Sequence, residues 1–301
     1  MLRISTGQMY QQGLDGILKN QAKMSRTQEQ ISTGRRILRP SDDPAGSTQV
    51  LELNRAARTV EQYQKNADRA QNRLELVDNT LSGITTMLQR VNELALQGSS
   101  GTYNAAQRDM IAVEVRGMLS SVLDLANTTD SAGDYLFSGF QGKVKPFAAG
   151  AGTYTFSGDT GLREIRISAD RTVADSESGF HTFMDVPTAA GGVRDLFSTI
   201  DQIATALEAD TSPDTLVADI SSAIARIGEV HASVGSKQRS IDEQRDINEG
   251  FILTLETNRS KLEDVDIAEA ITNFNKEKVA LEAAQASFAQ MQGLLLFNFI
   301  R

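Results

Sequence analysis

Apolar residues recur every seven positions at both ends of this chain. A seven-residue repeat places its members on one stripe of a helix, and such a stripe is buried when a partner helix covers it. We therefore predict a helix at each end whose stripe residues make assembly contacts. The predicted contacts are Tyr10, Ile17, Met24, Ile31 and Leu38 at the N-terminal end and Ile267, Phe274, Leu281, Phe288 and Leu295 at the C-terminal end.

The half-repeat positions between these residues are not steadily apolar, so each terminal helix carries only half of a coiled-coil seam. We expect these helices to be marginal in one molecule and to order fully when neighbouring subunits cover their remaining faces. The half-repeat residues are Leu14, Gln21, Gln28 and Arg35 in the first helix and Ala270, Glu277, Ala284 and Met291 in the last.

The central helices have more complete patterns. Both half-repeats are apolar over about 45–97, and one continuous helix of this length would extend about 75–80 Å. A second helix is predicted over 104–129, and the short connection implies an antiparallel hairpin. Helical patterns return at 193–209 and after Pro213, where Asn248 interrupts a heptad and His231, at a half-repeat position, is expected to pack.

Two connections separate the terminal helices from the long ones. In the first, Asp43 precedes a proline, so it is biased away from helical geometry and suits the N-cap of a helix that begins at Pro44. The second is expected at 262–266, with Ser260 as a candidate cap.

The pattern changes from helical to alternating between about residues 141 and 191. Tyr154 and Phe156 alternate with polar residues, as do Ile165 and Ile167, and the glycine-containing segment 158–161 lies between the two runs. This arrangement predicts a β-hairpin.

We therefore predict a mainly α fold, a long antiparallel helical rod built from the N- and C-terminal halves with a small β-rich inserted domain. Residues 1–43 plus 264–301 form the predicted terminal coiled-coil assembly region. Residues 44–135 plus 193–263 form the helical rod domain, and residues 136–192 form the β-rich insertion domain.

Composition and charge limit the functions that the chain can have. The chain has no cysteine, which excludes disulfides and thiolate metal sites, and its net charge of −9 argues against nucleic-acid binding. Residues 1–40 carry seven Lys/Arg against two Asp/Glu, whereas residues 263–301 carry three against six. The two ends either form separate solvated faces or lie close and attract. No apolar run is long enough to span a membrane. The first residues lack the apolar core of a secretory signal, so we expect export, if it occurs, to use no cleaved signal.

No catalytic or cofactor-binding pattern is visible. The two histidines, His181 and His231, lack metal-ligand spacing, and no phosphate-binding loop, nucleophile motif or dinucleotide motif occurs. We expect neither an enzyme nor a cofactor or metal site. An acidic group at the start of the last helix lacks the spacing of a calcium loop and is interpreted as a helix-start cluster; it consists of Glu263, Asp264, Asp266 and Glu269.

Three segments resemble bacterial flagellins and their hook-associated relatives. Residues 31–46, which read ISTGRRILRPSDDPAG, are similar to the N-terminal turn of that family, and residues 260–268 resemble its C-terminal turn. Residues 285–300 are similar to its last helix. Within the family, the opening residues 1–6, the two prolines of the turn, and Tyr135–Gly139 followed by Pro146 and Phe147 favour members that lie between hook and filament.

The resemblance implies a structural subunit of the flagellum, exported without a cleaved signal and located outside the cell. Its implied partners are further copies in a helical tube, the first hook-associated protein, flagellin, and a cytosolic export chaperone on the C-terminal helix. The alternatives are a short flagellin that forms the filament itself, a soluble coiled-coil partner-binding protein, and an enzyme carried by the insertion.

Overall fold

The computed structural model describes the backbone of residues 6–150 and 152–299 and the side chains of residues 8–150 and 152–291. The chain forms two compact units. Unit 1 contains residues 1–59 and 251–301, and unit 2 contains residues 60–250. Long helices dominate both units and the strands are confined to the middle of the chain, which confirms the predicted mainly α fold with a small β-rich insertion. In the described part of the chain, no helix has an apolar stretch long enough to cross a bilayer.

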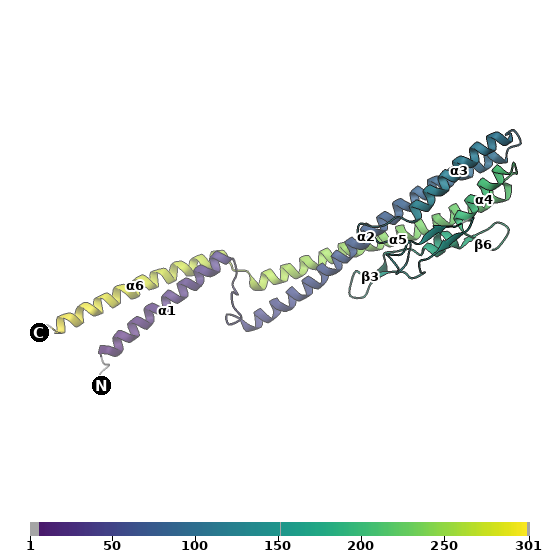
Figure 1. Ribbon diagram of the computed structural model, residues 1–301. Coiled ribbons are helices and arrows are strands. Elements are labelled where there is room, and N and C mark those ends of the chain that lie inside the picture. The colour runs from purple at the N-terminus through teal and green to yellow at the C-terminus, as the bar shows by residue number, and fades with distance from the viewer. Residues whose placement is uncertain (1–5, 151, 300–301) are drawn as a thin grey trace. The chain divides into compact units, whose positions relative to one another are not determined.

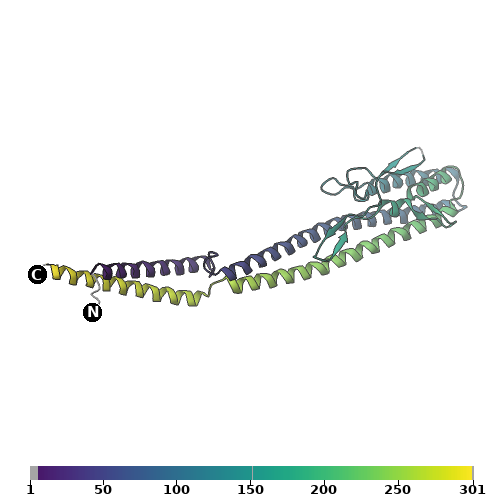
Figure 2. The ribbon, with the colours of Figure 1, turned by 90° about the horizontal axis from the view of Figure 1, so that it is seen from below.

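Unit 1 is a pair of terminal helices joined to the ends of two long ones. Helix α1 spans Thr6–Thr33 and helix α6 spans Ile267–Phe299, and they lie side by side in both views (Figures 1 and 2). The unit also contains the beginning of α2, which spans Pro44–Ser99, and the end of α5, which spans Asp214–Glu263.

Unit 2 contains the rest of α2 and α5 together with two shorter helices. Helix α3 spans Ala105–Ala126 and begins with a capping box of Asn104 and Gln107. Helix α4 spans Leu196–Glu208, and the Asp195 carboxylate caps it by accepting a hydrogen bond from the N–H of Ser198. The predicted helices at 45–97, 104–129 and 193–209 are thus confirmed, with ends shifted by a few residues.

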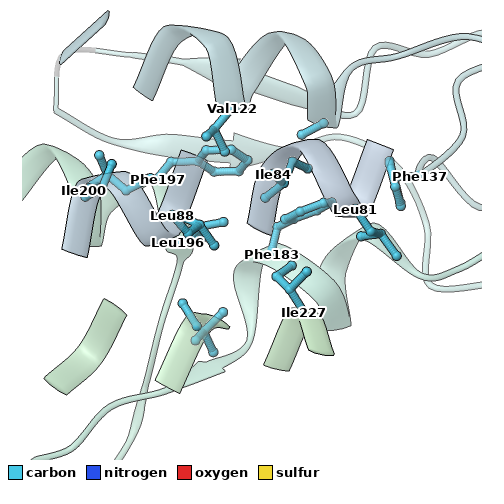
Figure 3. Close-up of a cluster of buried hydrophobic side chains, with 14 of the residues drawn as sticks. Leu81, Ile84, Leu88, Val122, Phe137, Phe183, Leu196, Phe197, Ile200 and Ile227 are labelled. Atoms are coloured by element: carbon cyan, nitrogen blue, oxygen red, sulfur yellow. The ribbon is translucent and has the colours of Figure 1, made fainter. Parts of the chain in front are cut away.

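The core of unit 2 is built on the seam of α2. From Ala67 to Ala95 both half-repeats of that seam are completely buried, because α3, α4 and α5 cover them, whereas Tyr63 is half-buried. Side chains from the insertion complete the core. The ring centroid of Phe183 lies 5.1 Å from that of Phe137 (Figure 3). It lies 5.3 Å from that of Phe147. The buried α2 residues are Leu74, Val77, Leu81, Ile84, Leu88 and Val91.

The middle of the described chain contains three separate antiparallel hairpins, and the third reaches Arg194, two residues beyond the predicted insertion. Strand β1 (Phe147–Ala149) pairs with β2 (Tyr154–Phe156), with Phe147 opposite Phe156. Strand β3 (Glu164–Arg166) pairs with β4 (Thr172–Ala174), with Ile165 opposite Val173. Strand β5 (Val186–Pro187) pairs with β6 (Val193–Arg194), and the π-helical turn η1 (Phe180–Met184) precedes β5.

The predicted pairing of segment 154–156 with segment 164–168 is therefore wrong. Gly152 adopts a φ of +79° and supports the tight turn that returns β2 to β1 instead. After β2, the carboxylate of Asp159 accepts hydrogen bonds from the backbone N–H groups of Phe140 and Gly161. These bonds hold segment 158–161 against the preceding loop, so it does not form a hairpin turn.

The expectation for His231 is also wrong. Its side chain is 43% exposed, and Nε2 lies 2.7 Å from Oδ1 of Asp78 on α2. The residue therefore forms a polar contact at the edge of the α2–α5 seam and does not pack inside it.

Candidate assembly site

The terminal stripes meet in unit 1. Of the predicted contact residues, Ile17, Met24 and Ile31 on α1 and Phe274, Leu281 and Phe288 on α6 are half-buried in the described structure. The ring centroid of Tyr10 lies 5.0 Å from that of Phe288, although Tyr10 remains 45% exposed. Ile267, at the first turn of α6, is equally exposed. One helix pair therefore covers these stripes only in part.

Leu38 does not belong to the helical stripe. Helix α1 ends at Thr33, and Gly34 adopts a φ of +72° while its N–H donates a hydrogen bond to the carbonyl of Gln30. This is a common helix ending, because glycine tolerates the left-handed conformation without a steric penalty. Leu38 lies beyond it and lines a surface pocket with Ala22 and Ser25. The side chain of Leu295 lies outside the described residues.

The half-repeat residues of α1 stay outside the seam, as expected from the polarity of Gln21 and Gln28. Leu14, Gln21 and Gln28 are exposed, and the residues that precede each of them face α6 instead. These are Gly13, Asn20 and Thr27, of which Thr27 is buried and the others are half-buried. Sequence reasoning missed them because small and polar residues do not resemble a seam.

Gly13 shows why small residues occupy these positions. A Cβ atom there would lie 2.8 Å from Cδ2 of Phe288, so glycine lets the aromatic ring approach the backbone of α1. On α6, in contrast, the half-repeat residues do line the pair, although half a seam was expected: Ala270 is buried, and Glu277, Ala284 and Met291 are half-buried.

The α1–α6 pair leaves apolar surface uncovered. Five large apolar side chains outside the seam are each at least 40% exposed, and they are distributed over both helices. Burial of apolar surface is favourable at roughly 25 cal/mol per Å², so further helices placed on these faces would stabilise the pair. These residues are Met9, Leu14, Leu18, Ile271 and Val279.

Opposite charges do not hold the two helices together directly. Helices α1 and α6 are neighbours, as one interpretation of the charge pattern requires, but among the described residues no ion pair joins them. The charged groups of α1 reach its own connection instead: Arg26 lies 2.9 Å from Asp42, and Glu29 lies 3.8 Å from Arg39.

The two connections of unit 1 bind each other through their backbones. Arg35 and Asp264 form an antiparallel bridge. The N–H of Arg36 donates to the carbonyl of Glu263 at 2.6 Å, and the N–H of Val265 donates to the carbonyl of Gly34 at 3.0 Å. We call this bridge, together with the side chain of Arg36, the clasp.

The Arg36 side chain extends the clasp to both long helices. Its Nη2 atom donates to the carbonyl of Leu262 in the last turn of α5 at 2.7 Å. The same atom lies 3.2 Å from Oδ2 of Asp43, the residue before α2. In addition, Gln30 of α1 donates to the Arg36 carbonyl at 2.8 Å. Arg36 therefore contacts the ends of three helices, a role that no sequence pattern indicated.

Asp43 acts as the predicted cap of α2, whereas Asp42 binds backbone N–H groups of the turn that precedes it and caps no helix. Asp43 accepts a hydrogen bond of 2.9 Å from the N–H of Gly46, and α2 begins at Pro44. That bond, and secondarily Arg36, holds the pKa of Asp43 below its ordinary value. Asp42 accepts from the N–H of Arg39 at 3.0 Å, and this bond, with a smaller contribution from Arg26, lowers its pKa as well.

At the second connection the cap is Asp266 and not Ser260. The Asp266 carboxylate accepts hydrogen bonds from the N–H groups of Ala268 and Glu269 at the start of α6. Ser260 lies within α5, and its hydroxyl contacts the carboxylate of Asp264. Glu263 is mostly buried and pairs with Arg35 at 3.0 Å. In the described residues no group of acidic and histidine side chains is arranged to hold a metal ion.

Sequence models of the two helical regions of bacterial flagellin match this chain. The bacterial flagellin N-terminal helical region matches residues 4–142, and the C-terminal helical region matches residues 217–300. The chain belongs to the bacterial flagellin family. All six strands lie between the two matched regions.

Relatives that match over nearly the whole chain include two proteins that share one name. The flagellar hook-associated protein 3 of Escherichia coli is 29% identical over 99% of both chains. The protein of that name from Salmonella typhimurium is 27% identical over 100% of both chains. Among solved structures, a putative flagellar hook-associated protein from Vibrio parahaemolyticus superposes with a TM-score of 0.68 at 20% identity, covering 74% of this chain and 100% of that one. This last likeness concerns the fold.

Proposed function

We propose that this chain is a structural subunit of the bacterial flagellum that joins the hook to the flagellin filament. The observation that carries the proposal is the end-to-end similarity to relatives named flagellar hook-associated protein 3, which includes the insertion as well as the helical regions. The proposed role is mechanical and needs no catalytic group.

The state of unit 1 supports assembly as the function. Helices α1 and α6 cover each other on one side only and keep Leu14, Leu18 and Ile271 exposed. A coiled-coil protein whose seams are all covered in the monomer or dimer would rarely expose apolar faces of this kind. A subunit of a tube would bury them against neighbouring copies. The ten stripe residues predicted as assembly contacts remain part of this proposal.

The proposed partners follow the position in the flagellum. Copies of this chain contact one another in a helical arrangement, with the first hook-associated protein on one side and flagellin on the other. The segment Leu294–Phe297 is apolar in sequence, and before assembly such a segment needs a cover. We assign this cover to a cytosolic export chaperone, and the assembled chain to the exterior of the cell.

Removal of α6 tests the proposal. A chain that lacks residues 265–301 should still be made, but the cells should lose motility and release flagellin into the medium because the filament has no base to attach to. The control is the full-length chain expressed at the same level in the same deletion strain. Normal motility with attached filaments would contradict an assembly role.

A short flagellin is the second candidate, because the matched family regions carry the flagellin name. The two candidates differ in how far they polymerise. A flagellin added to filament seeds should elongate them without limit, whereas a junction subunit should add a short zone and stop. Electron microscopy of seeded reactions distinguishes the two results.

A further inference from the structure

Most of the seam between α1 and α6 carries little information about register. The seam residues of α1 beside its stripe are small or polar, and the half-repeat positions of α6 include two alanines. If α1 moved by one heptad, Thr27 would take the place of Asn20 and Met24 that of Ile17, and such exchanges between similar residues permit slippage. Gly13 is the exception, because Asn20 in its place would meet the ring of Phe288.

A polar seam residue can fix register by pairing across the helices, but Glu277 does not do so here. Within the described part of the chain, the buried Oε2 atom of Glu277 has no hydrogen-bond partner. The carboxylate therefore does not bind a particular residue of α1 through this atom. Apart from the packing of Phe288 on Gly13, the register therefore depends on contacts outside the seam.

The helices nevertheless keep one register along their length. Tyr10 contacts Phe288 near one end, and Arg35 pairs with Asp264 at the other. The segments that separate these two contacts have nearly equal lengths, since Arg35 follows Tyr10 by 25 residues and Phe288 follows Asp264 by 24. Of these two contacts, only the one at the clasp is made by directional hydrogen bonds.

We propose that Arg36 is a positioning residue that sets the register of α1 on α6 by tying the first connection to the second. Its backbone N–H binds Glu263, and its guanidinium binds both the Leu262 carbonyl and Asp43. A shift of α1 along α6 would break the contacts with Glu263 and Leu262, whereas Asp43 lies in the same connection as Arg36 and orients its guanidinium. The inference rests on the proposed function, because the register decides which apolar residues the pair presents to neighbouring subunits.

Cysteine pairs can report the register, because the chain contains no cysteine of its own. Gly13→Cys with Phe288→Cys reports the native register, since a Cβ atom at Gly13 lies 2.8 Å from Cδ2 of Phe288 and the second substitution removes the ring that it would meet. Asn20→Cys with Phe288→Cys reports a shift of one heptad, which is about 10 Å along the helix. Each pair is placed in the full-length chain in flagellated cells and oxidised, and the intramolecular product is measured by electrophoresis.

With Arg36 present, the native pair should give most of the product. Arg36→Ala should lower the ratio of native to shifted product about tenfold, the change expected when a hydrogen bond to a charged group is lost. Asp43→Asn is the second variant, because asparagine still caps α2 but carries no charge for Arg36. It should shift the ratio in the same direction. Arg39→Ala is the matched control, because this guanidinium is exposed and lies 3.8 Å from its acidic partner.

Two results would overturn the inference: an unchanged ratio in both Arg36→Ala and Asp43→Asn, or no preference for the native pair when Arg36 is present. If Arg36→Ala fails to accumulate as a folded chain, the ratio in Asp43→Asn decides. The deletion of residues 265–301 separates this inference from the proposed function. Detached filaments in the deletion strain together with an unchanged ratio would refute the register role alone.

Discussion

The side-chain amide of Asn248 donates a hydrogen bond of 3.1 Å to the backbone carbonyl of Ile167. Asn248 is 4% exposed and lies at the point where the heptad of α5 is interrupted, and Gln244 donates to its Oδ1 atom at 3.0 Å. The polar residue therefore binds the segment that follows β3 to the long helix. What looks like a defect in a helical repeat is the attachment point of the insertion.

Asn248→Leu should destabilise unit 2 although it restores the apolar repeat. The carbonyl of Ile167 and the amide of Gln244 would be left buried without their partner, at a cost of about 1–3 kcal/mol. Asn66→Leu is the control, because Asn66 donates to the Arg166 carbonyl where water can replace it. Urea denaturation of the two variants measures the difference. A more stable Asn248→Leu protein would contradict this account of the interruption.

Gly98→Ala and Gly117→Ala should change stability in opposite directions. A Cβ atom at Gly98, near the end of α2, would overlap the side chain of Leu207, and overpacking of this kind costs about 1–3 kcal/mol. Gly117 lies in α3 with open space around its Cα, so alanine should stabilise the helix there by about 0.5–1 kcal/mol. The midpoint of thermal unfolding of each variant measures these changes. Destabilisation by Gly117→Ala would contradict the prediction that a methyl group is accommodated there.

Gly13→Leu should impair assembly, whereas Gly16→Leu should not. The first substitution places a side chain where the ring of Phe288 lies, and the second points into open space. Both substitutions lie in unit 1, which carries the proposed assembly contacts. The fraction of flagellin that remains attached to cells therefore measures the effect. Equal attachment in the two strains would show that the α1–α6 seam of the single chain is not the arrangement used in the flagellum.

Acid should weaken the start of α2 through Asp43. Because the pKa of this carboxyl is lowered in the folded chain, its stabilising contribution is present above its ordinary pKa of about 4 and is lost as the pH falls through the lowered value. Protection of the Gly46 amide from hydrogen exchange reports this loss, since that N–H binds Asp43. Asp43→Asn should remove the pH dependence of the protection, and Asp42→Asn should keep it.

The sequence was most informative where one physical rule acts locally. The long helices follow from their heptads, and the cap at Asp43 follows from the proline beside it, because a proline restricts the residue before it and starts a helix well. These features depend on neighbours in the chain. The seam of α2 is likewise buried from Ala67 to Ala95, as its pattern required, and half-buried at Leu53, Ala56 and Tyr63.

The errors concern choices that depend on distant residues. Gly13, Asn20 and Thr27 complete the seam of α1 because α6 approaches closely, and no property of these residues alone indicates that approach. The pairing of β2 with β1 depends on Gly152 and on the bonds of Asp159. The same limit applies to the candidate site. Its stripe residues could be predicted from spacing, but the position of Arg36 between the ends of α2 and α5 arises only when the two halves of the chain meet.

The brevity of the six strands has a consequence for a protein whose proposed role is to polymerise. None exceeds three residues, and each pairs only within its own hairpin. An exposed strand edge is a template on which further chains can stack without limit, and long, flat edges are the dangerous ones. The described strands therefore offer no long edge on which identical copies could pair. Helical surfaces are left to determine how many subunits join and where growth ends.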